Sequence, residues 1–260
     1  MPSHPSYHPI PTLQLQAPPE LPQQHLGMNM HCNTIVPTKL HIWQQNARKS
    51  QTAQHYILNT DPLLYDLILL QEPWIDSYGN ARGNHHWCIV YPSNRHTGGH
   101  STIRSVILVN ANISTDTYAT LSIPHSNITA IQLKGELGYC SIFNVYNNCT
   151  NNSTTNAHHA CLNNNLALIL PLPTDHMLWF GNFNRHHLLW EEDKNHRLFS
   201  PPHLIDPLID TIQEFNMILA LSPRIPTYKS VASNWMRPDN MWRSNNPTNL
   251  IISCDTKPSM

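Results

Sequence analysis

From residue 39 onward, short apolar runs alternate with polar connections. Ten runs rich in β-branched and aromatic residues predict strands. These strands are predicted at 40–43, 66–70, 86–91, 104–110, 128–133, 139–146, 177–180, 217–221, 240–243 and 249–253. Helical spacing is found at 48–59, 155–170 and 203–216, and the first two of these segments end before prolines. Many strands with few helices favour an α/β sandwich, in which two packed sheets are flanked by helices.

Residues 1–38 form a proline-rich segment with few large apolar residues. Its prolines are Pro2, Pro5, Pro9, Pro11, Pro18, Pro19, Pro22 and Pro37. Such a composition cannot bury a core, so a disordered tail is predicted. One domain of ordinary size is predicted for residues 39–260.

Charged residues make up only 12% of the chain, and the formal net charge is −1. The usual charged share is about 25%. This balance argues against strong sequence-independent DNA binding, which needs many Lys and Arg side chains facing phosphates. Transient contact with a nucleic acid substrate needs fewer cations and stays possible.

Several classes of protein are disfavoured. None of the six cysteines forms a C-x-x-C pair, which argues against a zinc ribbon or a thioredoxin site, while Cys88 and Cys140 lie in apolar runs typical of buried thiols. The N-terminus lacks the basic start and apolar stretch of a signal peptide. The longest apolar stretch, at 63–70, is too short to span a bilayer. We therefore expect an intracellular protein, nuclear or cytoplasmic, with no membrane partner.

Polar residues stand where the predicted strands end. They are Asn46, Glu72, Tyr146, Asn182 and Asn184, and Asp239 comes just before another strand. If the strands lie side by side, these ends converge on one edge, where oxygen ligands would suit a hard cation such as magnesium. Such a cation would polarise a phosphate. Any single one of these residues is more often a turn or cap residue, so the prediction depends on the whole set.

Five segments, in this order, resemble the endonuclease/exonuclease/phosphatase superfamily, and most of all the apurinic-type endonuclease domain of fungal non-LTR retrotransposons. They are IWQQNARKS (42–50), LILLQEPWI (67–75), SIFNVYNN (141–148), LWFGNFNRHHLLWEE (178–192) and RPDNMWRS (237–244). The most specific is 178–192. The resemblance spans roughly residues 39–255.

The resemblance implies a four-layer α/β sandwich of two mixed sheets flanked by helices. It also implies hydrolysis of a DNA phosphodiester with Mg²⁺ or Mn²⁺. By the same resemblance Glu72 would be the metal ligand, and Asn46 would lie beside the metal or order its water. Tyr146 would contact the scissile phosphate, Asn184 would orient the phosphate or the attacking water, and Asp239 would orient a catalytic histidine. His186, His187 and Trp190 would be structural or would lie at the edge of the substrate site.

The sequence departs from the family pattern at two places. Where the family has the Asp that activates water, this chain has Asn182, and an amide has no basic site near neutral pH. The family also ends its core with an Asp-His pair, whereas Asp255 is followed by Thr256. We therefore expect a domain truncated at its C-terminus, lacking its last strand, with very low activity.

Four hypotheses follow from these observations. The first is a metal-dependent DNA endonuclease, impaired in this copy, and the second is a non-catalytic remnant with the same fold. The third is a phosphatase of small phosphorylated molecules on that fold, against which segment 178–192 argues. The fourth is a histidine-rich zinc protein, which no paired ligand spacing supports.

Overall fold

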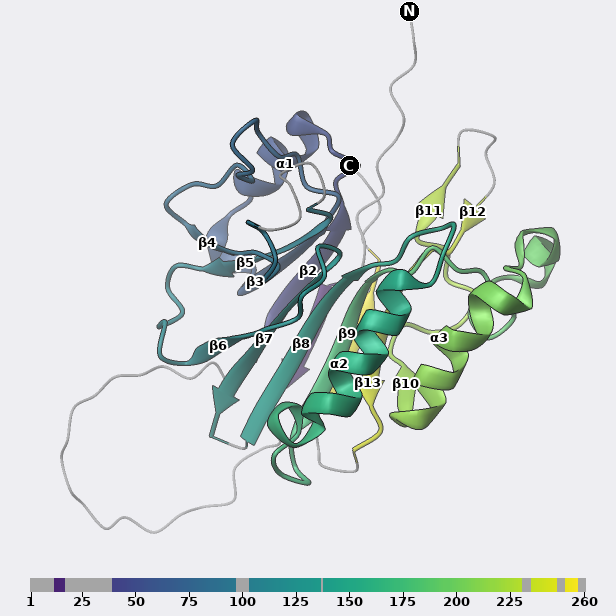
Figure 1. Cartoon of the computed structure of the whole chain (residues 1–260). Helices are drawn as coiled ribbons and strands as arrows, with labels where there is room; N and C mark the ends of the chain where they lie inside the picture. The colour runs from purple at the N-terminus through teal and green to yellow at the C-terminus, as the bar shows by residue number, and fades with distance from the viewer. Residues whose placement is uncertain are drawn as a thin grey trace, which may run out of the picture.

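The computed structural model describes residues 12–16, 39–96, 103–136, 138–230, 235–246 and 251–256. Two six-stranded sheets pack against each other, with helix α1 (Gln51–Leu58) outside the first sheet and helices α2 (Ser153–Ile169) and α3 (Pro202–Glu214) outside the second (Figure 1). Two short 3-10 helices, η1 (Pro62–Leu64) and η3 (Asp193–Leu198), lie in the connections. This arrangement confirms the predicted four-layer α/β sandwich.

The first sheet is mixed, with one parallel pair at its centre. Its spatial order is β14 (Ile251–Asp255), β1 (Thr12–Gln16), β2 (His41–Asn46), β3 (Leu67–Gln71), β5 (Ser105–Asn110) and β4 (Trp87–Val90). Strands β2 and β3 are parallel, and the other neighbours are antiparallel. The ends of β2 and β3 therefore lie side by side, with Asn46 opposite Gln71.

The second sheet repeats this plan. Its order is β10 (Met217–Leu219), β13 (Asp239–Ser244), β9 (His176–Asn182), β8 (Gly138–Tyr146), β7 (Ile128–Gly135) and β6 (Tyr118–Leu121). Strands β8 and β9 are parallel, and the other neighbours are antiparallel. A small hairpin of β11 (Tyr228–Lys229) and β12 (Trp235–Met236) stands apart from both sheets (Figure 1).

Apolar side chains fill the space between the sheets and beneath the helices. Ile42 and Leu69 of the first sheet belong to the same buried cluster as Ile142, Leu178 and Phe180 of the second. Both faces of the central strands are covered, so these strands are near-continuous apolar runs, as the sequence predicts. Removing this area from water is the main term that holds the layers together.

One buried polar side chain fixes how the two sheets meet. Asn144 of β8 donates from Nδ2 to the carbonyl oxygens of Leu70 (3.0 Å) and Val106 (2.8 Å), and its Oδ1 accepts from Gln71. A buried amide is costly unless it is hydrogen-bonded, so other offsets between the sheets are penalised. The contact places the end of β3 against the C-terminal part of β8, two residues before Tyr146.

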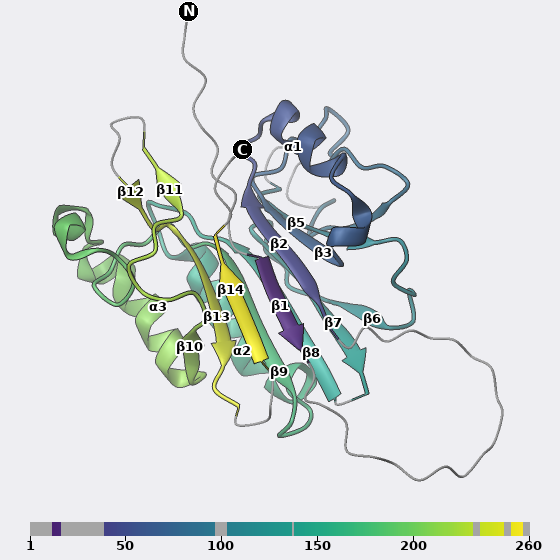
Figure 2. The same cartoon turned by 180° about the vertical axis from the view of Figure 1, so that it is seen from behind.

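One segment differs from the sequence expectation. Thr12–Gln16, within the predicted disordered tail, forms β1 between β14 and β2, and its sequence alternates apolar and polar residues as strands do (Figure 2). The rest of the tail, 1–11 and 17–38, lies outside the described residues. Ile251–Asp255 forms β14 at the edge of the first sheet and corresponds to the strand predicted at 249–253. The strand that is expected to be lacking would follow it, and residues 257–260 lie outside the described residues. In the described part of the chain no helix is long and apolar enough to cross a membrane.

Candidate active site

All six residues that the sequence proposes for the site line one cleft of about 230 Å³. They are Asn46 and Glu72 from the first sheet and Tyr146, Asn182, Asn184 and Asp239 from the second. The rest of the wall is formed by Gln45, Arg48, His186, Thr227, Tyr228, Met236 and Pro238. The structure thus brings the predicted residues together, while the role of each stays a prediction.

On the first-sheet side, the parallel strands β2 and β3 deliver Asn46 and Glu72. Asn46 ends β2, and its Oδ1 accepts from the backbone N–H of Arg48 at 2.8 Å. Glu72 follows β3 with a left-handed backbone, φ 47°. Hydrogen bonds to the backbone of Arg104 (2.8 Å) and Lys49 (2.7 Å) hold it there. A left-handed non-glycine residue costs of order 1–3 kcal/mol and often marks a functional site.

An arginine that the sequence analysis missed contacts the Glu72 carboxylate. Arg104 Nη1 lies 2.6 Å from Glu72 Oε1 and 3.3 Å from Tyr146 Oη, and its guanidinium lies 5.2 Å from the centre of the tyrosine ring. The pKa of the Tyr146 phenol is raised to about 12, mainly by burial and in second place by the negative charge of Glu72. The phenol is therefore protonated at neutral pH and can donate a hydrogen bond.

On the second-sheet side, three strands place three site residues in register. Asn182 of β9 lies opposite both Tyr146 of β8 and Asp239 of β13. Gly181 permits the close approach of β9 to β8, since a Cβ there would lie 1.9 Å from the carbonyl oxygen of Val145. The order β8–β9–β13 thus sets these three side chains along one edge of the sheet.

The two asparagines of this side are tied to the backbone. Asn182 is buried, and its Oδ1 accepts from the N–H of Asn184 at 3.0 Å. Asn184 has a left-handed backbone, φ 48°, and its Nδ2 donates to the carbonyl oxygen of Asn147 at 2.7 Å. Both amides are held in fixed positions at the cleft wall, and neither can act as a base.

Asp239 is a buried carboxylate with an incomplete set of partners. Its Oδ2 accepts from the Thr227 hydroxyl at 3.1 Å, while its Oδ1 is buried and has no partner among the described residues. Burial raises the pKa of this carboxyl to about 7, against the pull of Thr227, Arg48 and Arg237. The histidine that Asp239 would orient by resemblance is replaced by Thr256. The unpaired oxygen is consistent with that loss.

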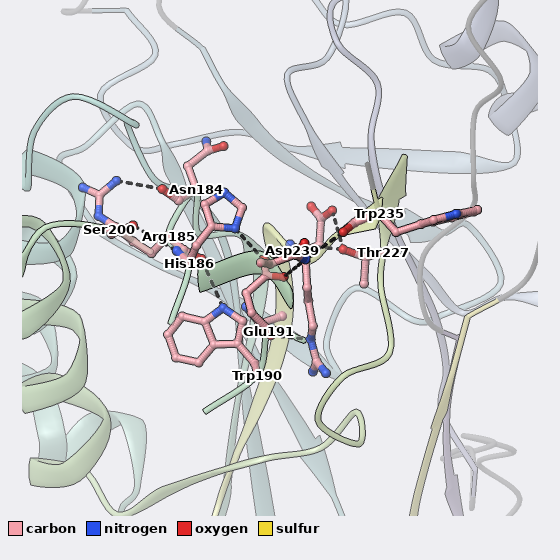
Figure 3. A network of polar contacts seen from close by, with 12 residues as sticks. Asn184, Arg185, His186, Trp190, Glu191, Ser200, Thr227, Trp235 and Asp239 are labelled. Atoms are coloured by element: carbon pink, nitrogen blue, oxygen red, sulfur yellow. Dashed lines mark hydrogen bonds and ion pairs between the residues drawn. The ribbon is translucent and has the colours of Figure 1, made fainter. Parts of the chain in front are cut away.

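A network of polar contacts connects residues of the second-sheet wall with buried side chains next to them (Figure 3). Arg185, which is fully buried, donates to the carbonyl oxygens of Leu204, Asn148, Asn184 and Asn151 and to Asn152 Oδ1, over 2.7–3.0 Å. The Trp190 indole donates back to the carbonyl oxygen of Arg185 at 3.1 Å. This cluster fixes the loop that carries Asn184.

A second part of the network involves one of the predicted histidines. His186 lines the cleft, and its Nδ1 lies 2.5 Å from Oε1 of the buried Glu191. The same oxygen accepts from the backbone N–H of Arg237 at 2.8 Å, and Oε2 accepts from Asn195 at 2.8 Å. His186 is thus anchored at the edge of the cleft, whereas Trp190 is fully buried and does not line the cleft.

Three residues that shape the site were missed at the sequence level: Arg104, Thr227 and Glu191. Arg104 stands alone before β5, and Thr227 lies in a loop, so neither has a motif around it. Glu191 lies inside segment 178–192, the most specific of the segments that resemble the superfamily. Its place there was the one signal in the sequence that could have indicated it. Their partners are 32, 12 and 5 residues away along the chain, so spacing alone could not show them.

The donor set does not fit a tightly bound Mg²⁺ or Mn²⁺. Such a cation is held by one or two carboxylates together with water and substrate phosphate. Of the two carboxylates that line the cleft, Glu72 is bonded to a guanidinium, and burial raises the pKa of Asp239 to about 7. The other side-chain oxygens nearby are largely neutral amides. Within the described residues, no group of three or more His, Cys, Asp or Glu could hold a metal ion.

Comparisons with known proteins agree with this fold. The model of the family described as endonuclease-reverse transcriptase matches residues 140–257. The endonuclease domain of TRAS1, a telomere-specific non-LTR retrotransposon, has a TM-score of 0.57 at 14% identity, covering 78% of this chain and 84% of that one. The AP endonuclease LMAP from Leishmania major has a TM-score of 0.57 at 12% identity, covering 79% of each chain.

A more distant protein, a β-hairpin deletion mutant of β toxin from Staphylococcus aureus, matches with a TM-score of 0.50 at 7% identity, over 81% of this chain and 89% of that one. No protein of curated function matches. At these identities the solved structures show the fold alone. Together with the family match, they confirm the resemblance to the endonuclease/exonuclease/phosphatase superfamily and to retrotransposon endonuclease domains.

Proposed function

We propose that this chain is a phosphodiesterase domain of the retrotransposon endonuclease type that binds DNA phosphate in its cleft but hydrolyses it very slowly. The observation that carries the proposal is the convergence of the six predicted residues on one cleft, with an amide at the position of the base. The polar wall suits a phosphate better than an apolar ligand. DNA as the substrate class comes from the resemblance.

Four residues have proposed roles toward the phosphate. Tyr146, whose phenol is protonated, would donate a hydrogen bond to a phosphate oxygen. Asn184 would orient the phosphate or a water through its fixed amide, and Asn46 would do the same from the first-sheet side. Arg48, which lines the cleft and stacks over Tyr228 at 4.2 Å, would supply positive charge.

The proposed slow hydrolysis follows from two residues on the second-sheet side of the cleft, Asn182 and Asp239. Loss of a positioned general base typically costs about 10²–10⁴-fold in rate, and Asn182 cannot replace it. Loss of a donor that stabilises charge on the phosphate commonly costs about 10²–10³-fold, and Asp239 has no histidine partner among the described residues. These factors do not simply multiply, because residues that act as a unit are non-additive.

The non-catalytic alternative also has an observation in its favour. The charge of Glu72, which by resemblance would hold the metal, is met by Arg104 at 2.6 Å. A protein in which this pair persists would bind phosphate without cutting it. The phosphatase of small molecules has no comparable support, because the match at 140–257 is to an endonuclease family.

The test combines DNA binding with DNA cutting. We expect weak, salt-sensitive binding of a short fluorescent oligonucleotide, reduced about tenfold by Tyr146→Phe combined with Arg48→Gln. We expect no nicking of supercoiled plasmid above background with Mg²⁺, Mn²⁺ or EDTA. Nicking that needs metal and is lost in Glu72→Gln would contradict the impairment and would make His186 or His187 the first candidate base. Binding that the double substitution leaves unchanged would contradict the assignment of the cleft.

A further inference from the structure

Glu72 and Arg104 form the one ion pair that reaches the cleft from the first-sheet side in the described structure. The two side chains retain 18% and 31% of their exposure, so the pair lies at the boundary of the cleft. Arg104 itself is not among the lining residues, yet both residues it contacts are. It therefore acts on the site through Glu72 and Tyr146.

Only one end of the guanidinium is used. Nη1 makes both contacts, while Nε and Nη2 donate to no described residue. Arginine has five N–H donors in a planar fork that matches phosphate as well as carboxylate. One guanidinium nitrogen is therefore enough to engage both Glu72 and Tyr146.

A second cation faces the same space. Arg48 lines the cleft and forms no ion pair with a described residue, and its charge is felt by Asp239 on the opposite wall. With Glu72 neutralised by Arg104 and Asp239 partly protonated near neutral pH, Arg48 leaves the cleft with a positive balance. A positive, polar cleft attracts anions and disfavours a divalent cation.

We propose that Arg104 takes the charge-neutralising place of a divalent cation at Glu72, so that the cleft binds a phosphate group through Arg48 and Tyr146 without metal. This inference rests on the proposed function and specifies how the same cleft holds its ligand. Arg104 is a positioning residue: it satisfies the carboxylate and holds the tyrosine hydroxyl toward the phosphate. A metal and Arg104 would compete for the same carboxylate.

The first experiment measures phosphate and metal binding on the whole chain. Inorganic phosphate is titrated in EDTA and followed by NMR amide shifts, and Mn²⁺ is titrated separately and followed by electron paramagnetic resonance. We expect Arg104→Gln to weaken phosphate binding about tenfold and to strengthen Mn²⁺ binding by a similar factor. Arg82→Gln is the matched control, because Arg82 is exposed, stacks on Trp74 and does not line the cleft.

Weaker phosphate binding together with stronger Mn²⁺ binding would show that Arg104 is a positioning residue. If Arg104 had only a structural role, its replacement would weaken the binding of both phosphate and Mn²⁺. Glu72→Gln supplies an independent test should Arg104→Gln fail to fold. We expect this variant to bind phosphate in EDTA as well as or better than the wild type, because it removes a negative charge from the cleft wall and leaves the charge of Arg104 in place. Phosphate binding that requires Mn²⁺ and is lost in Glu72→Gln would overturn the inference but leave the proposed function intact. Phosphate that shifts no cleft amide under either condition would overturn both.

Discussion

Two carboxylates face the same cleft, Glu72 from the first sheet and Asp239 from the second, and their surroundings differ. Glu72 is partly exposed and is bonded to Arg104 at 2.6 Å. Asp239 is buried, has one hydroxyl partner, and has one oxygen without any partner among the described residues. Burial raises the pKa of Asp239 to about 7.

The difference shows how environment assigns properties to one functional group. A partly exposed carboxylate beside a guanidinium keeps its charge at little cost. A buried carboxylate without an ion-pair partner is protonated more readily than an exposed one. Asp239, on the second-sheet side of the cleft, therefore belongs to the protein core. Glu72 and Arg104, on the first-sheet side, form an ion pair near the surface.

The largest expected effect comes from restoring both sides at once. Asn182→Asp supplies a base, Thr256→His completes the Asp-His pair, and Arg104→Gln frees Glu72. We expect the triple variant to nick supercoiled plasmid with Mg²⁺ at least about 10²–10⁴-fold faster than the wild type. β14 runs in the same direction as β2, because both strands are antiparallel to β1, so it ends toward the edge of the first sheet that carries Asn46.

The control is the triple variant with Glu72→Gln added, which should be inactive. We also expect Asn182→Asp with Thr256→His alone to recover less activity than the triple variant, because Arg104 still holds Glu72. A folded triple variant that cuts no DNA would remove the mechanistic support for the nuclease lineage.

The next largest effect concerns the contribution of Arg185 to the stability of the protein. Arg185→Met keeps the length of the side chain but removes five hydrogen bonds to the loops around Asn184. Buried acceptors left without donors are costly, so we expect the free energy of unfolding to fall by at least about 3 kcal/mol. Urea denaturation followed by tryptophan fluorescence measures this. A loss below about 1 kcal/mol would mean that the loop is not held by Arg185.

The third prediction concerns pH. In the folded protein Asp239 keeps its proton up to a pH of about 7, because burial raises its pKa, whereas the unfolded chain releases it near 3.8. The folded state therefore binds more protons between these values, and its stability falls as the pH rises from about 4 to 7. Asp239→Asn removes this dependence.

We expect Asp239→Asn and the wild type to be similarly stable at pH 4, and the variant to be more stable by about 2 kcal/mol at pH 8. The measured quantity is the difference between the two urea curves at each pH. That difference cancels the effect of His158, whose pKa burial lowers to about 3 in both proteins. A difference that is the same at both pH values would mean that Asp239 is ionised throughout.

The smallest expected effect completes the comparison. Glu72→Gln removes an ion pair whose side chains are 18% and 31% exposed. Pairs near the surface contribute little, so we expect the free energy of unfolding to change by less than about 1 kcal/mol at pH 8. A change as large as that of Arg185→Met would show that the first-sheet side is also part of the core.

Much of the fold follows from local patterns. The apolar runs at 66–70, 104–110 and 177–180 became β3, β5 and β9, because strands covered on both faces leave a clear signature. Shorter strands were missed: β6, β11 and β12 have few buried residues to mark them. Cys88 was predicted to be buried and is exposed, because β4 is an edge strand with one open face.

The sequence by itself determined which polar residues end the strands, and it identified the amide at 182 and the threonine at 256. Only the tertiary structure decided their surroundings. The order β8–β9–β13 sets Tyr146, Asn182 and Asp239 side by side in the second sheet. The antiparallel pairing of β3 with β5 in the first sheet brings Arg104 to Glu72 across 32 residues of chain. Burial and charge pairing depend on neighbours in space. The same chemical group is therefore an ion-pair partner near the surface at Glu72 and a buried acid with a raised pKa at Asp239.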